Sequence, residues 1–171
     1  MDRSRDNLRS NLGCGAKFKS NHSDRASYYK AQENQAQTDK NMKFGYTIIY
    51  VSSVADALTF YKDAFGFETR YLHESGQYGE LNTGETILAF ASHAMGEMNL
   101  DGKYQKTDLS SKPLGIELAF VTEDVASADA QAVTAGAVAI REPAAKLWGQ
   151  MVAYVRDREG TLIELCSPAN A

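Results

Sequence analysis

From residue 44 onward, apolar residues follow first a strand pattern, then a helical one, then three more strand patterns. β-Branched and aromatic residues fill the run 44–51, which predicts a buried strand. Apolar residues at helical spacing predict a helix over 54–65, which Gly66 ends. Three further strands are predicted after it, separated by turn signals, at 67–73, 79–82 and 85–91. Residues 42–92 are therefore expected to form one βαβββ module.

The same order of elements returns after a polar stretch. Residues 115–122 predict a strand, residues 125–135 predict a helix that Gly136 ends, and three strands are expected at 138–142, 151–157 and 161–166. The interval between the two series is about 70 residues, which is too long for a solenoid repeat and typical of a duplicated domain. We therefore predict a second module at 115–168, a linker with a short helical turn at 93–114, and a tail at 169–171.

Residues 1–41 differ in composition from the rest of the chain. They are rich in Asn, Gln, Ser, Asp and Lys and show no sustained hydrophobic period. Such a segment cannot bury enough apolar surface to fold alone, so it is expected to be a disordered or upstream-derived leader. The alternative is a helix around 25–37 that packs on a partner subunit.

The distribution of charge along the chain indicates which kinds of partner it can bind. The whole chain has a net charge of −4, and residues 1–41 hold eight of its 18 Lys/Arg and five of its 22 Asp/Glu. Residues 42–171 therefore carry 10 basic and 17 acidic residues. An acidic surface repels phosphates, so nucleic acid is not expected as a partner. No apolar run of about 20 residues predicts a membrane span, and residues 1–11 lack the apolar stretch of a secretory signal, so we expect a cytoplasmic location.

The sequence contains few motifs that carry chemistry by themselves. Cys14 and Cys166 are the only cysteines and form no C-x-x-C pair, so both are expected as reduced thiols, with Cys166 packed as a small apolar side chain. No nucleophile elbow, phosphate-binding glycine loop or dinucleotide fingerprint is present in the sequence.

Three stretches of the chain resemble one known superfamily. They read VSSV followed by FYKDAFGF at 51–67, FVTEDV through AGA at 120–137, and DREGTLIEL at 157–165. In this order and spacing they are similar to the signatures of the glyoxalase, bleomycin-resistance and extradiol-dioxygenase (vicinal oxygen chelate) superfamily. The resemblance implies an α+β fold in which two βαβββ modules form a curved, open barrel around one cavity. It also implies a homodimer, since paired modules in this superfamily often complete their sites across a two-fold interface.

The resemblance also implies where metal ligands would stand. Matching the strands of the two modules places Tyr46 and Glu117 at the first-strand positions, and Leu88 and Glu164 at the last-strand positions. Metal-dependent members use histidine with glutamate there, whereas leucine cannot ligate and tyrosine seldom does. The three histidines, His22, His73 and His93, lie elsewhere in the sequence. We therefore expect no metal; the alternative is a hard ion such as Mg²⁺ or Mn²⁺ held by oxygen ligands.

The two glutamates need a partner if the cavity is apolar. One option is a protein group, such as Tyr46 or a basic side chain, and the other options are a cationic ligand or a metal. Trp148, just before the penultimate strand, offers a flat face to an aromatic or cationic ligand, or else simply caps the barrel core. Tyr154 on that strand adds aromatic wall to the predicted pocket.

These features favour a small-molecule-binding protein of the bleomycin-resistance type that holds an aromatic or cationic ligand without a metal. The predicted ligand-binding residues are Tyr46, Leu88, Glu117, Trp148, Tyr154 and Glu164. The alternative is a lyase, isomerase or dioxygenase-type enzyme in which Glu164 or Glu117 acts as the catalytic base or as an oxygen ligand of a divalent metal. A third hypothesis is an interaction protein whose own side chains fill the cavity.

Overall fold

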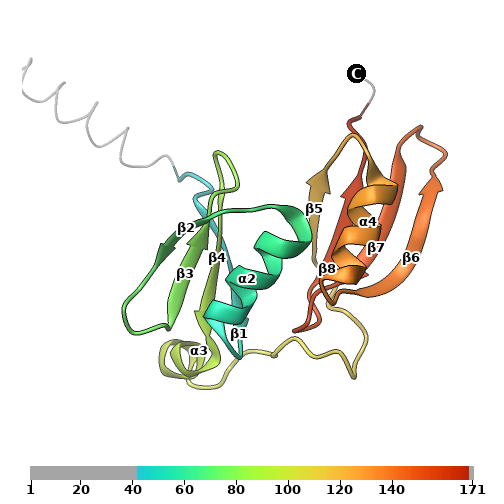
Figure 1. Cartoon of the computed structure of the whole chain (residues 1–171). Helices are drawn as coiled ribbons and strands as arrows, with labels where there is room; N and C mark the ends of the chain where they lie inside the picture. The colour runs from blue at the N-terminus through green and yellow to red at the C-terminus, as the bar shows by residue number, and fades with distance from the viewer. Residues whose placement is uncertain (1–41, 170–171) are drawn as a thin grey trace, which may run out of the picture. The chain divides into compact units, whose positions relative to one another are not determined.

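The computed structural model describes residues 42–169, and the leader and Cys14 and His22 within it lie outside that range. The first module contains β1 (Tyr46–Val51), α2 (Val54–Phe65), β2 (Thr69–Leu72), β3 (Tyr78–Leu81) and β4 (Ile87–Ser92). After α3 (His93–Leu100), the second contains β5 (Glu117–Val121), α4 (Val125–Thr134), β6 (Val138–Ala145), β7 (Met151–Arg156) and β8 (Leu162–Cys166). The predicted βαβββ order is thus present twice (Figure 1).

Each module has its own four-stranded mixed sheet. The strand orders are β1-β4-β3-β2 and β5-β8-β7-β6, in which β1 runs parallel to β4 and β5 runs parallel to β8. The remaining pairs are antiparallel. Among residues 42–169 no ladder joins the two sheets, so they stay open. The expected α+β fold of two open, duplicated modules is confirmed.

Local signals set the helix ends. The Ser53 side chain accepts a hydrogen bond from the Asp56 amide at the start of α2, and Gly66 ends the helix in the left-handed conformation with φ 76°. Asp124 caps α4 in the same way, accepting from the Ser127 amide at 2.9 Å. Both helices begin where the sequence predicts and α2 also ends there, whereas α4 ends at Thr134, one residue before the predicted end.

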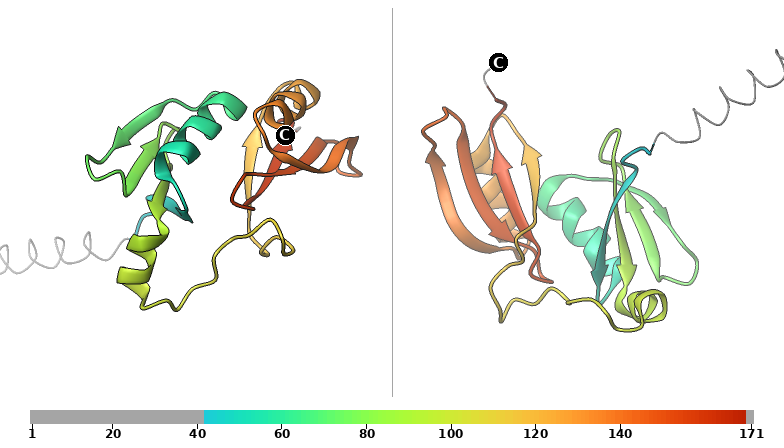
Figure 2. Two further views of the ribbon diagram at one scale, coloured as in Figure 1. Left: turned by 60° about the horizontal axis from the view of Figure 1, so that its bottom comes forward. Right: turned by 180° about the vertical axis from the view of Figure 1, so that it is seen from behind.

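A helix covers one face of each sheet, and the opposite face is called its open face below (Figure 2). Tyr61 and Phe60 of α2 and Phe90 of β4 lie at 2% exposure or less in the core. Ile163 and Leu165 of β8 are buried in the same cluster as residues of α4. Because successive strand residues point to opposite faces, the residues between these positions project from the open faces.

Two elements differ from the sequence prediction. The segment expected as a linker with a short helical turn contains the eight-residue helix α3, capped by Ser92. Strand β6 reaches Ala145 and passes through Pro143, although proline breaks most strands. The position tolerates it because β6 is the edge strand of its sheet and its register with β7 shifts between Arg141 and Ala144. No helix in residues 42–169 is long and apolar enough to cross a membrane.

Candidate functional site

The open face of the second sheet brings together three of the six predicted site residues. Glu164 on β8 is paired with Ala119 of β5 on one side and with Tyr154 of β7 on the other. Glu117 lies two residues before Ala119 and therefore projects from the same face. We call Glu117, Tyr154 and Glu164 the acidic group. Glu117 is exposed, while Tyr154 and Glu164 are half-buried.

The acidic group is coupled electrostatically. Its carboxylates, with partial burial, raise the pKa of Tyr154 to about 12; hydrogen bonding to Glu164 is the largest cause, and the charge of Glu117 adds to it. A neighbouring thiol responds to the same charges. Burial, followed by the charge of Glu164, raises the pKa of Cys166, which is a free cysteine as expected. A negatively charged ligand would be repelled by this face, and a cation would be attracted.

The carboxylates of the acidic group lack a basic partner among the described residues. Within residues 42–169, neither Glu117 nor Glu164 forms an ion pair. Lys146 lies near this group, but over the aromatic ring: its Nζ is 5.3 Å from the centroid of the Tyr154 ring. The ring therefore already presents its face to one ammonium group at this site.

Tyr46 lies on the open face of the other sheet and is 50% exposed. The same sheet carries a polar group that the sequence analysis missed, formed by Arg70, Tyr78 and Glu80. The Tyr78 hydroxyl donates to Oε1 of Glu80 at 3.0 Å, and Nε of Arg70 lies 3.7 Å from Oε2 of Glu80. Burial and this carboxylate raise the pKa of Tyr78 to about 12. The signal for it was the alternation of Tyr78 and Glu80 along one short strand, which turns both side chains to one face.

The structure places Leu88 away from the open face and corrects the matching of the last strands. Leu88 is 5% exposed and belongs to the core. Tyr46 is paired with Ile87 and Glu117 with Leu162, so two residues further on Ala89 corresponds to Glu164. The match of the last strands by sequence is therefore wrong by one residue, and a shift of one residue turns a side chain to the opposite face.

Trp148 occupies the predicted loop position just before β7, at the tip of the β6–β7 hairpin. Its side chain is 65% exposed, and its Nε1–H donates to Oε1 of Gln150 at 3.0 Å. The indole therefore does not cap the core. Its hydrogen-bonding group is already used within the hairpin, which leaves the faces of the ring as its free surface.

The donor set does not fit a transition metal. Of the four ligand positions, with Ala89 in place of the expected Leu88, Tyr46 and Ala89 supply no strong ligand and only Glu117 and Glu164 supply carboxylates. No group of three or more His, Cys, Asp or Glu within residues 42–169 is arranged to hold a metal ion. The described histidines serve elsewhere, since His73 bonds Ser75 at 2.8 Å and His93 bonds Tyr104 at 3.1 Å.

Residues 44–170 match the family model described as a glyoxalase-like domain. No curated protein matches the chain significantly.

Solved structures share the fold at low sequence identity. A glyoxalase-related enzyme from Fulvimarina pelagi is 17% identical with a TM-score of 0.64, and the match covers 75% of this chain and 89% of that one. A glyoxalase/bleomycin resistance protein/dioxygenase family enzyme from Burkholderia phytofirmans PsJN is 22% identical with a TM-score of 0.62, over 74% and 98% of the two chains. A glyoxalase/bleomycin resistance protein/dioxygenase from Nocardioides is 12% identical with a TM-score of 0.59, over 80% and 92%.

Proposed function

Since the chain belongs to the glyoxalase-like domain family, in which it matches over residues 44–170, we propose that it binds a small cationic, aromatic molecule at the acidic group without a metal. The observation that carries this proposal is the placement of Glu117 and Glu164 around the half-buried ring of Tyr154 without a basic partner among the described residues. A ligand ammonium would supply the missing positive charge, and the tyrosine ring would supply a stacking surface.

The surroundings of the acidic group support a cation in particular. Residues 42–171 carry 17 acidic and 10 basic side chains, so the long-range field attracts positive ligands. Lys146 shows that the Tyr154 ring accommodates an ammonium at 5.3 Å. A ligand cation would displace this flexible lysine and gain the two carboxylates. Trp148, two residues along the same hairpin, offers a second aromatic face.

Isothermal titration with benzyltrimethylammonium, an aromatic quaternary cation, tests the proposal, with benzyl alcohol as the neutral comparison. We expect saturable binding of the cation and a matching change in the fluorescence of Trp148, the single tryptophan of the chain. Glu164→Gln should weaken the cation about tenfold or more and leave benzyl alcohol unchanged, because it removes a charge-assisted contact.

Glu123→Gln is the matched control. It removes the same charge from an exposed position before α4, outside the acidic group. An equal loss of affinity in both variants would show that only net charge matters and would contradict the proposed site. Absence of saturable binding of benzyltrimethylammonium would contradict the function itself.

The enzyme alternative uses the same two carboxylates, as a general base or as oxygen ligands of Mg²⁺ or Mn²⁺. Elemental analysis of the purified protein separates the two functions. A stoichiometric divalent metal that is lost in Glu164→Gln would favour the enzyme and overturn the metal-free proposal.

We also propose that the protein is a homodimer that covers the open faces. Large apolar side chains stand exposed there, including Ile48 at 47% and Val121 at 67%. In a two-fold dimer, the first-sheet face of each copy can cover the second-sheet face of the other copy. Both Ile48 and Val121 would then be buried. Sedimentation velocity should give a dimer that Ile48→Lys dissociates. Val133→Lys, at an exposed position of α4, is the matched control and should leave the dimer intact.

A further inference from the structure

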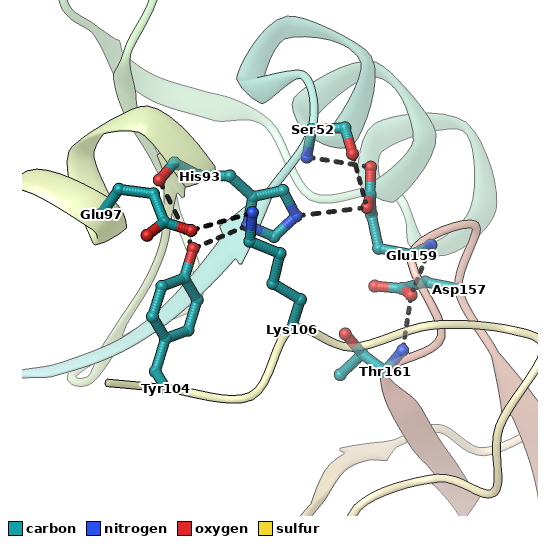
Figure 3. Close-up of polar contacts among 8 residues, drawn as sticks. All are labelled: Ser52, His93, Glu97, Tyr104, Lys106, Asp157, Glu159 and Thr161. Carbon is teal, nitrogen blue, oxygen red and sulfur yellow. Dashed lines mark hydrogen bonds and ion pairs between the residues drawn. The ribbon is translucent and has the colours of Figure 1, made fainter. Parts of the chain in front are cut away.

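A carboxylate in the turn between β7 and β8 meets two residues that precede the second module. Oε1 of Glu159 accepts a hydrogen bond from the Ser52 amide at 3.1 Å. Oε2 accepts from the Ser52 hydroxyl at 3.1 Å and lies 3.9 Å from Nε2 of His93, the first residue of α3 (Figure 3). We call Ser52, His93 and Glu159 the latch. It joins the end of β1 and the start of α3 to a turn that lies 107 residues beyond Ser52 in the sequence.

The two ionisable side chains of the latch are largely shielded from water. The His93 side chain is 18% exposed and the Glu159 side chain is 24% exposed. Partly buried charges interact more strongly than charges on an open surface, because solvent and salt screen them less. A proton gained or lost by His93 therefore changes the strength of the contact with Glu159.

The far side of the imidazole can accommodate both protonation states. Nδ1 of His93 lies 3.1 Å from the Tyr104 hydroxyl, which is also 3.4 Å from the carbonyl oxygen of His93. When the ring is neutral, the hydroxyl can donate to Nδ1 while Nε2–H faces Glu159. When the ring is protonated, Nδ1–H donates to the hydroxyl oxygen and the hydroxyl can donate to the carbonyl oxygen. The ring thus gains a proton without losing a hydrogen-bond partner.

The other charged groups around the latch have partners of their own. Lys106 of the linker pairs with Glu97 of α3 at 3.0 Å. In the β7–β8 turn, the Asp157 carboxylate accepts from a buried tyrosine hydroxyl. Arg156 and Arg158 donate to backbone carbonyl oxygens. Within residues 42–169 no Lys or Arg pairs with the glutamate of the latch, so the charge of its histidine decides the contact.

The latch is tied to two walls of the cleft between β1 and β5. Linker residues 104–107 and turn residues 160–162 line this cleft, together with Glu117 of the acidic group. The linker bonds the latch through Tyr104 and His93, and the turn belongs to it through Glu159. A change of charge on the imidazole therefore acts on both walls at once.

We propose that the latch is a pH-sensitive switch, in which protonation of His93 holds the β7–β8 turn and the linker against the first module. Histidine is the side chain that ordinarily changes its charge between about pH 5 and 8. At the acidic end of this range the imidazolium pairs with Glu159, and as the pH rises this attraction is lost and the turn opens more often. The inference goes beyond the proposed function, since it requires no ligand at the acidic group.

The Ser52 amide reports directly on the latch, because it donates to Glu159. Hydrogen exchange of the ¹⁵N-labelled full chain, followed by NMR and corrected for the intrinsic effect of pH, gives the protection factor of this amide. We expect about fivefold higher protection at pH 5.5 than at pH 8, the effect of one ion pair near the surface. His93→Gln keeps a hydrogen-bonding side chain without a charge and should make the two protection factors equal.

Glu159→Gln should also remove the difference, because a neutral amide does not pair with an imidazolium, although it can still accept from the Ser52 amide. His73→Gln is the matched control. It removes a histidine at an exposed position after β2, outside the latch, and should keep the fivefold difference. Equal protection at both pH values in the natural protein would overturn the inference. So would a pH dependence that persists in His93→Gln, which would assign the effect to a carboxyl group such as Asp157.

Discussion

The Tyr61 hydroxyl in α2 donates a 3.0 Å hydrogen bond to Oδ2 of Asp157 in the turn between β7 and β8. Both side chains are buried, at 1% and 2% exposure. The bond joins the helix of the first module to the turn of the second across 96 residues of sequence. The same turn receives the Ser52 hydroxyl, which donates to Glu159 at 3.1 Å. This pair of contacts holds the turn between β7 and β8 against the first module.

We expect Tyr61→Phe to lower the free energy of unfolding by about 1–3 kcal/mol, because a buried carboxyl loses one of its donors. Urea denaturation followed by circular dichroism measures the change. Tyr71→Phe is the control, since the Tyr71 side chain is 46% exposed. Equal stability of the two variants would show that the buried bond contributes nothing.

The stability contributed by Asp157 should fall as the pH rises. Burial raises the pKa of this carboxyl above its ordinary value, although hydrogen bonds from the Thr161 amide and from Tyr61 oppose the shift. The native state then holds the proton more tightly than the unfolded chain, so stability declines between the unfolded pKa of about 3.9 and the raised native value.

Asp157→Asn cannot titrate and isolates this effect. As the pH rises through that interval, the natural protein should lose unfolding free energy relative to Asp157→Asn. Above the interval the difference between the two proteins should stay constant. Urea titrations at a series of pH values measure it. A difference that moved in the opposite direction would mean that the hydrogen bonds outweigh burial.

Gly79→Ala should destabilise the first module by about 1–3 kcal/mol through overpacking. An added Cβ would stand 2.8 Å from Cδ1 of Leu58 and 3.0 Å from Cγ1 of Val54, where α2 packs closely on β3. Gly45→Ala is the matched control, because nothing lies within 4 Å of its added Cβ. Thermal unfolding of both variants gives the comparison, and an unchanged midpoint for Gly79→Ala would contradict the close packing.

The tyrosine of the acidic group should report on its carboxylates. The pKa of Tyr154 is raised to about 12, mainly by Glu164 and burial and less by Glu117. Glu164→Gln should therefore bring this pKa back towards 10, and Glu117→Gln should lower it by less. NMR titration of ¹³C-labelled tyrosine rings measures both. If Glu117→Gln had the larger effect, Tyr154 would have to lie closer to Glu117 than to Glu164.

Much of the candidate site followed from the resemblance to the superfamily, which placed Glu117 and Glu164 at the ligand positions of the first and last strands of the second module. Glu117, Tyr154 and Glu164 were expected to line one pocket, and the structure brings them onto one open face. Leu88 was predicted at the wrong position because the turns before β4 and β8 do not bring the two strands into the same register. Only the pairing with β1 and β5 reveals this difference. Glu80 was missed although it alternates with Tyr78 on one strand, because Arg70 approaches it only in the folded sheet.

By itself the sequence determined the duplicated βαβββ order, because hydrophobic period and turn chemistry act over a few neighbouring residues. Its three motifs also indicated the family, which the match over residues 44–170 confirms. Tertiary structure alone decided that Arg156 points into the linker, that Trp148 stands on the surface, and that Glu159 meets Ser52 and His93. Each of these depends on segments distant in sequence meeting in space, where burial and the available partners decide what a side chain does.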